Sequence, residues 1–126
     1  MIKKPTIGIT MGDPAGIGSE IIVKAFHQGK LEEFCRPIVI GDAEAIEGMV
    51  KSLKLSLAVK SVQEIKDDLI YNNTINVIDL KNIGIGQIKF GFPSKTAGTA
   101  VVEYIKKAVE LAMNKKIDAI TKAPIN

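Results

Sequence analysis

The chain has 126 residues, of which 46% are hydrophobic and 25% charged, a balance that suits one globular domain with an ordinary core. Its formal charge is +3, and scattered lysines with few aromatic residues argue against a nucleic-acid surface. The chain holds one cysteine and neither an apolar run long enough to span a membrane nor a signal-peptide pattern, so we expect a cytoplasmic protein without disulfides.

The first predicted strand covers residues 6–11, which are β-branched or apolar and uncharged, as expected of a strand covered on both faces of a parallel sheet. A glycine turn with Gly12, Gly16 and Gly18 follows and leads into a predicted helix over residues 18–28. Glycines let backbone approach a ligand closely, and a helix start directs free N–H groups to the same place. The turn is typical of an anion-binding junction, yet its spacing matches neither the dinucleotide fingerprint nor the Walker loop. A tight turn without a ligand is the alternative.

The rest of the chain alternates between strand and helix patterns. Asp42 is predicted to cap a helix with an apolar face from Ala45 to Leu53, and Ser94 to cap a long helix that continues to Ala112. Glycines interrupt residues 81–93, which predicts a connection, with a second ligand loop as the alternative. Further strands are predicted over residues 37–41, 57–60, 75–79 and 117–121. This alternation predicts a three-layer α/β/α fold with a mostly parallel sheet, and no linker marks a second domain within residues 1–126.

Candidate ligand-facing groups follow the first and last strands, because α/β ligands gather at the carboxyl ends of parallel strands. Asp118 stands near the start of the last predicted strand, at the opposite edge, where we expect it to cap backbone or face solvent. His27 is the only histidine, so a histidine metal site cannot form from this chain alone, and we expect it to be solvated or to cap its helix. The candidates are Asp13, Gly16, Ile17 and Gly18 after the first strand, and Thr121, Lys122, Pro124 and Asn126 after the last.

Three segments resemble one family. The run from Thr10 to Glu20, TMGDPAGIGSE, is similar to the opening motif of the 4-hydroxythreonine-4-phosphate dehydrogenase family of pyridoxal phosphate biosynthesis. The run from Ile117 to Asn126, IDAITKAPIN, resembles the strand of that family that ends in Thr-x-Ala-Pro-Ile-Asn, and a weaker match runs from Ser94 to Ala100. Ser19 stands where the family usually has proline, and serine is also at ease in a first helical turn. The resemblance spans this whole chain but only about the first third of a family member.

The resemblance implies a domain like that of isocitrate and isopropylmalate dehydrogenases, incomplete here, from a homodimeric two-domain enzyme. Such an enzyme oxidises 4-phosphooxy-L-threonine with NAD and a divalent metal (zinc, magnesium or cobalt), with decarboxylation to 3-amino-2-oxopropyl phosphate. By resemblance, Asp13 and residues 16–18 line the NAD side of the cleft, and Thr121 and Asn126 line the substrate side. The histidines that hold the metal belong to the later part of a family member, so the resemblance assigns this chain no catalytic or metal-binding residue.

Two hypotheses of different class follow. In the first, the chain is the N-terminal portion of such a dehydrogenase and is inactive alone. The substrate then remains open, because the opening motif does not distinguish 4-phosphooxy-L-threonine from threonate or erythronate 4-phosphate. In the second, the chain is a free-standing, non-catalytic α/β module whose glycine turn is a weak nucleotide or phosphate site, or scaffold only.

Overall fold

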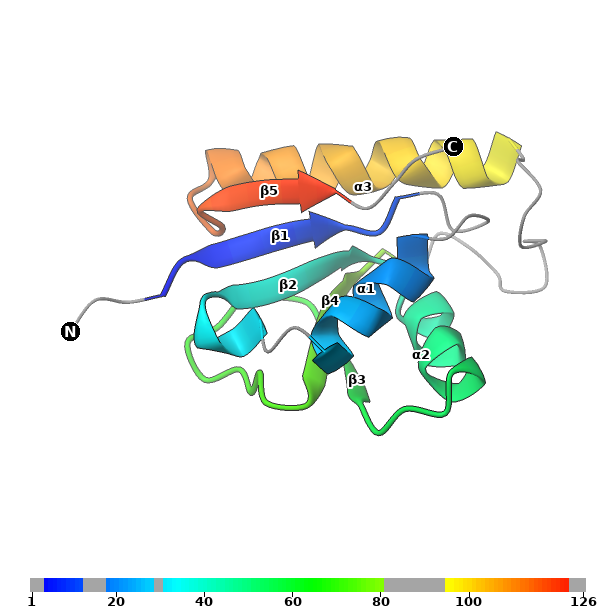
Figure 1. Cartoon of the computed structure of the whole chain (residues 1–126). Coiled ribbons are helices and arrows are strands. Elements are labelled where there is room, and N and C mark those ends of the chain that lie inside the picture. Colours follow the sequence, from blue (N-terminus) through cyan, green and yellow to red (C-terminus); the bar gives the residue numbers. More distant parts are fainter. Residues whose placement is uncertain (1–3, 13–17, 29–30, 81–94, 123–126) are drawn as a thin grey trace.

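The computed structural model describes residues 4–12, 18–28, 31–80 and 95–122. Within these residues, five strands form one sheet in the order β3-β4-β2-β1-β5, and every ladder between neighbours is parallel (Figure 1). The predicted parallel α/β fold is therefore confirmed. The strands are β1 (Thr6–Thr10), β2 (Arg36–Gly41), β3 (Ala58–Val62), β4 (Thr74–Asp79) and β5 (Ala119–Lys122).

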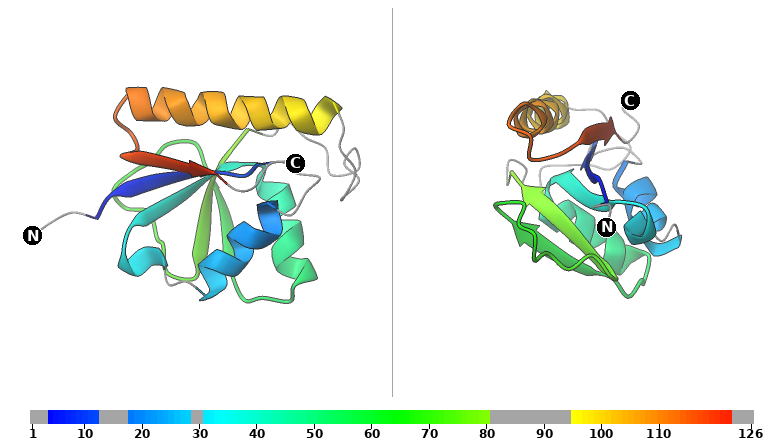
Figure 2. Two further views of the ribbon diagram at one scale, coloured as in Figure 1. Left: turned by 45° about the horizontal axis from the view of Figure 1, so that its top comes forward. Right: turned by 90° about the vertical axis from the view of Figure 1, so that its left-hand side faces the viewer.

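The helices lie in two layers. Helices α1 (Gly18–Gln28) and α2 (Ala43–Ser52) pack together on one face of the sheet, and α3 (Lys95–Met113) lies on the other (Figure 2). This division follows from handedness, because right-handed crossovers that run in opposite directions along a sheet place their helices on opposite faces. The crossovers through α1 and α2 lead from β1 toward β3, whereas α3 leads back to β5. A short 3₁₀ turn, η1 (Leu31–Glu33), precedes β2.

The core lies around β2 and β4. Each of these strands has a neighbouring strand on both sides, and the burial along each is nearly continuous. Strand β1 differs from the prediction of two covered faces. Its residues Thr6, Gly8 and Thr10 are buried, but Ile7 and Ile9 between them are only half-buried. Among the described residues, the sheet ends beyond β1 at the edge strand β5, whose four residues are all exposed. The face of β1 that carries Ile7 and Ile9 is therefore incompletely covered. The side chains that contribute most to the core are Met11, Val23, Ile38, Val39, Ile40, Ile46, Ile75, Val77 and Tyr104.

Candidate functional site

The two motif-bearing strands are neighbours in the sheet. Strand β5 pairs with β1 so that Thr121 lies opposite Ile9 and Lys122 opposite Thr10. Both strands therefore end at the same edge, which we call the carboxyl edge. Here α1 begins on one face of the sheet after β1, and α3 begins on the other face, whereas the far end of α3 leads into β5 at the opposite edge (Figure 2). This is the position at which open α/β sheets form their ligand crevice.

Close packing between β1 and β2 fixes the entry to the glycine turn. Met11 is fully buried, and its N–H donates to the carbonyl of Ile40 at 2.9 Å, one residue beyond the end of β1. Opposite it, a Cβ on Gly41 would lie 2.6 Å from the Cβ of Met11, so this position has no room for a side chain. Gly12 then takes a φ of 73°, in the left-handed region that favours glycine. The chain therefore bends away from the sheet at Gly12.

The start of α1 lies on the far side of the turn. Gly18 and Ser19 are buried there, with Glu20 in the first helical turn. Two hydroxyl oxygens, Thr10 Oγ1 before the turn and Ser19 Oγ after it, are buried and have no hydrogen-bond partner among the described residues. A buried polar atom without a partner costs about 1–3 kcal/mol, which makes such atoms rare unless a ligand or water satisfies them. The first N–H groups of a helix also lack partners within the helix, so both ends of the turn carry hydrogen-bonding groups that a ligand could satisfy.

Carboxylates at the ends of β2 and β4 hold the neighbouring backbone. Asp42 caps α2, as predicted, because its Oδ1 accepts from the N–H of Ala45 at 3.0 Å. Asp79 Oδ1 accepts from the N–H of Ala43 at 3.3 Å. Burial raises the pKa of Asp42, the hydrogen bond from Ala45 opposes that rise, and the charge of Asp79 adds to it. Both carboxylates therefore accept hydrogen bonds from the backbone at the start of α2.

Tyr104 of α3 is fully buried, close enough to Asp42 and Asp79 at this edge for their charges to act on its hydroxyl. Burial raises the pKa of its hydroxyl, and the nearby charges of Asp42 and Asp79 raise it further, so the phenol stays protonated. The sequence predicted a long helix that includes Tyr104 and a strand that ends at Asp79, and both are confirmed. It carried no signal that these two residues lie close together.

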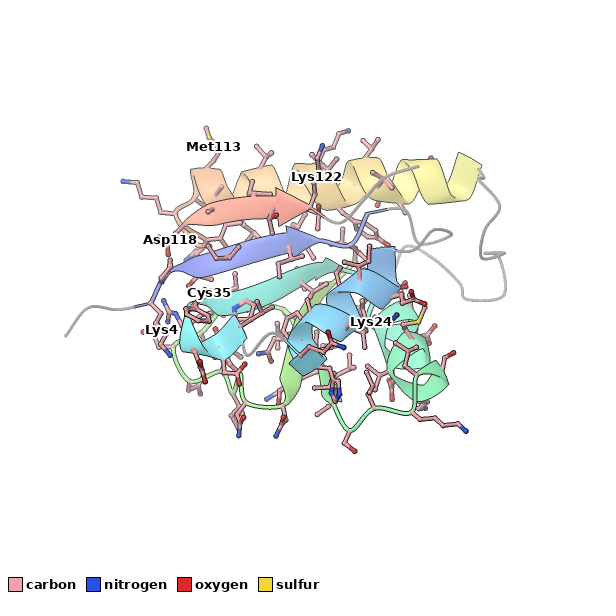
Figure 3. The ribbon with its side chains drawn as sticks, in the orientation of Figure 1. Lys4, Lys24, Cys35, Met113, Asp118 and Lys122 are labelled. Atoms are coloured by element: carbon pink, nitrogen blue, oxygen red, sulfur yellow. The ribbon has the colours of Figure 1, made fainter. Side chains whose placement is uncertain are left out.

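The predicted site residues are described only in part. Gly18 is buried at the start of α1, and Thr121 is exposed on β5. His27 is exposed at the end of α1, and Asp118 lies at the opposite edge, where its Oδ2 accepts from the N–H of Thr6 at 2.7 Å (Figure 3). Asp118 therefore caps backbone, as expected. Asp13, Gly16, Ile17, Pro124 and Asn126 lie outside the described residues, as do Ser94 and residues 81–93.

Two further properties concern metals and membranes. In the described part of the chain, no three His, Cys, Asp or Glu side chains come together in a way that would hold a metal ion. Among the described helices, even α3, with 19 residues, lacks the sustained apolar stretch that a bilayer crossing requires.

The fold defines a parallel α/β domain in which the two motif-bearing strands end at the same edge. The family model for the pyridoxal phosphate biosynthetic protein PdxA matches residues 33–126. The chain belongs to this family.

Solved and curated relatives agree with this assignment. A crystal structure of a 4-hydroxythreonine-4-phosphate dehydrogenase from Burkholderia phymatum superimposes with a TM-score of 0.91 at 41% identity, covering 99% of this chain and 38% of that one. The enzyme of that name from Klebsiella pneumoniae gives a TM-score of 0.87 at 31% identity, covering 98% of this chain and 38% of its own. A Clostridium botulinum protein, provisionally named D-threonate 4-phosphate dehydrogenase, is 43% identical over 124 residues, or 98% of this chain and 37% of the relative. The chain thus spans little more than a third of these proteins, which are all named as dehydrogenases.

Proposed function

We propose that this chain is the N-terminal part of an NAD-dependent dehydrogenase that oxidises a four-carbon hydroxy acid with a 4-phosphate group, and that its glycine turn binds the NAD. The observation that carries the proposal is a pair of buried hydroxyls, Thr10 Oγ1 and Ser19 Oγ, which stand before and after the turn and have no partner among the described residues. A dinucleotide presents phosphate oxygens and ribose hydroxyls, which would satisfy both groups and the free N–H groups at the start of α1.

The proposed roles follow the edge of the sheet. Asp13 and residues 16–18 contact the cofactor, and Gly12 and Gly41 hold the turn close to β2 so that its backbone can approach the ligand. Thr121 and Asn126, which follow the neighbouring strand β5, face the substrate. When bound, NAD would supply the hydride acceptor, and the residues named here would hold the cofactor and exclude water from it.

The proposed substrate is 4-phosphooxy-L-threonine. Oxidation of its C3 hydroxyl gives a β-keto acid, NADH and a proton, and loss of carbon dioxide then leaves 3-amino-2-oxopropyl phosphate. D-Threonate 4-phosphate is a second candidate, because the Clostridium botulinum relative carries that name at 43% identity.

Some parts of this proposal lie beyond the described residues. We assign no step to the divalent metal (zinc, magnesium or cobalt), because the described residues contain no cluster that would hold it. The homodimer implied by the resemblance and the cytoplasmic location expected from the sequence belong to the same proposal. We expect the 126-residue chain to form no NADH from 4-phosphooxy-L-threonine, NAD and metal, and turnover by this chain would contradict the assignment of the chemistry to a longer protein.

Calorimetric titration of NAD into this chain and three variants tests the cofactor site. Thr10→Val and Ser19→Ala each remove one hydroxyl, and each is expected to weaken binding about fivefold or more, since one hydrogen bond contributes about 1 kcal/mol. Thr6→Val is the matched control, because Thr6 is also buried and lies on the same face of β1 at its other end. Equal affinities in all four proteins, or no binding by the unmodified chain, would contradict the proposal.

A further inference from the structure

A cavity of about 360 Å³ lies at the amino ends of β1, β2 and β5, the edge opposite the glycine turn. Figure 3 shows Lys4 and Asp118 at this amino edge, with Lys122 toward the other end of β5. The two edges are separated by β1, whose five residues span roughly 13 Å. The charged lining consists of Lys4, Arg36, Lys115, Lys116, Asp67 and Asp118.

Arg36 is the most deeply placed of the four cations. It begins β2, its N–H donates to the carbonyl of Pro5 at 2.8 Å, and its side chain is only 21% exposed. Its guanidinium lies 3.7 Å from the carboxylate of Asp67, which is 89% exposed, and a pair so open to solvent contributes about 0–1 kcal/mol. Its Nε is buried and has no hydrogen-bond partner in the described part of the chain. The guanidinium that lines the cavity therefore has hydrogen-bonding capacity that no described residue satisfies.

A helix-ending motif brings two lysines to the same cavity. Lys115 has a φ of 59°, its N–H donates to the carbonyl of Ala112 at 3.0 Å, and the N–H of Lys116 donates to that of Leu111 at 2.8 Å. These two bonds form a Schellman motif, in which a left-handed residue ends the helix. A left-handed lysine is strained where glycine would be at ease, so the motif holds a cation here at some cost in stability.

The charges at the cavity do not cancel. Four cations face two carboxylates, and Asp118 already accepts a hydrogen bond from Thr6. A second buried donor lies near Arg36: the hydroxyl of Tyr71 has no partner among the residues that the structure describes, and the charges of Arg36 and Asp67 both act on it. An anion with two negative charges and several acceptor oxygens complements this arrangement.

We propose that the amino edge binds a small phosphate monoester, with its phosphate on Arg36, Lys115 and Lys116, at a site separate from the candidate cofactor site. Guanidinium and ammonium groups are the usual phosphate ligands of proteins, and the guanidinium supplies directional bonds. The cavity lies at the lower end of the range for small-molecule pockets, about 300–1,000 Å³, which leaves room for a short organic part beside the phosphate.

The test is calorimetric titration of the whole chain with inorganic phosphate and with ribose 5-phosphate, at an ionic strength held constant with sodium chloride. Both ligands are expected to bind saturably to one site. Lys115→Gly and Lys116→Ala are each expected to weaken binding about fivefold, as loss of one phosphate contact implies. Lys115→Gly also relieves the left-handed strain, so a loss of binding in this variant cannot result from poor folding.

Lys54→Gly is the matched control, because Lys54 is also left-handed, with a φ of 56°, and ends α2 through the same pair of backbone bonds. Its affinity for both ligands should equal that of the unmodified chain. Absence of saturable binding, or equal losses in Lys54→Gly and Lys115→Gly, would overturn the proposal. It would also be overturned if Thr10→Val abolished phosphate binding while Lys115→Gly did not, since the phosphate would then occupy the glycine turn. That outcome would leave the proposed cofactor site standing.

Discussion

Thr10 of β1 and Lys122 of β5 are directly paired in the parallel ladder between these strands. The pairing brings the beginning of the glycine turn and the end of the last strand to one edge of the sheet, although they come from opposite ends of the chain. The two motifs that indicated the family therefore lie at one edge of the sheet.

Gly41→Ala is expected to destabilise the fold, because the added Cβ would lie 2.6 Å from the Cβ of Met11, an atom near the backbone that cannot rotate away. Overpacking of this kind costs typically about 1–3 kcal/mol. Gly48→Ala in α2 is the matched control, since nothing lies within 4 Å of its added Cβ, and it should stabilise the helix by about 0.5–1 kcal/mol. Urea unfolding of both variants measures the two changes, and changes of the same sign would contradict the packing described at Met11.

Asp42→Asn and Asp42→Ala separate the cap of α2 from its charge. The alanine variant loses the acceptor for the N–H of Ala45 and should be about 1 kcal/mol less stable, whereas asparagine keeps an acceptor oxygen. Because the pKa of Asp42 is raised in the folded state, its contribution to stability is fully present below its unfolded pKa and declines as pH rises through the folded pKa. Asp42→Asn should therefore gain stability relative to the unmodified chain as pH rises from 3 to 7. Urea unfolding across this range tests it, and a constant difference would contradict the raised pKa.

Lys54→Gly should stabilise the protein by about 1 kcal/mol, because Lys54 ends α2 in the left-handed region that glycine adopts without strain. The thermal midpoint measures this effect. Lys51→Gly, three residues earlier and within α2, serves as a control in which the same substitution should have the opposite effect. It should lower the thermal midpoint, since glycine costs about 1 kcal/mol within a helix. A lower midpoint for Lys54→Gly would show that the left-handed turn is not strained.

The isolated chain should self-associate through the outer side of α3 and the open edge of β5. Val102, Val109 and Met113 form an apolar stripe along α3 with exposed fractions of 50%, 48% and 78%, and Ile120 on β5 is 43% exposed. Exposed apolar stripes and unpaired strand edges both favour association. The sedimentation coefficient should therefore rise with protein concentration.

The double variant Val109→Glu with Met113→Glu should reduce this association, whereas Ser56→Glu with Gln63→Glu, at exposed polar positions, should not. If the unmodified chain sediments as a monomer at every concentration, the stripe and the strand edge do not drive association, and the hypothesis of a free-standing module gains support.

Periodicity predicted the local structure well. The helix over residues 18–28 is confirmed at both ends, because Ile22, Val23 and Phe26 recur at helical spacing and are buried. The third strand was predicted over residues 57–60 but covers Ala58–Val62. It is an edge strand whose limits are set by its ladder with β4 rather than by its own weakly buried side chains.

Features built from several strands were not predictable in the same way. Strand order and the pairing of Thr10 with Lys122 depend on tertiary packing, for which a single sequence carries no periodic signal. Lys115, Lys116 and Arg36 were not among the predicted ligand-facing residues. Their convergence on one cavity depends on the adjacency of β1, β2 and β5.

Amide chemical-shift mapping by NMR, with NAD titrated into the ¹⁵N-labelled chain, tests the central claim most directly. The proposal predicts saturable shifts at Met11, Gly12, Gly18 and Ser19, with little change at Arg36 and Asp118 on the opposite edge. Absence of shifts around the glycine turn, or shifts confined to the amino edge, would contradict the assignment of the turn as the cofactor site.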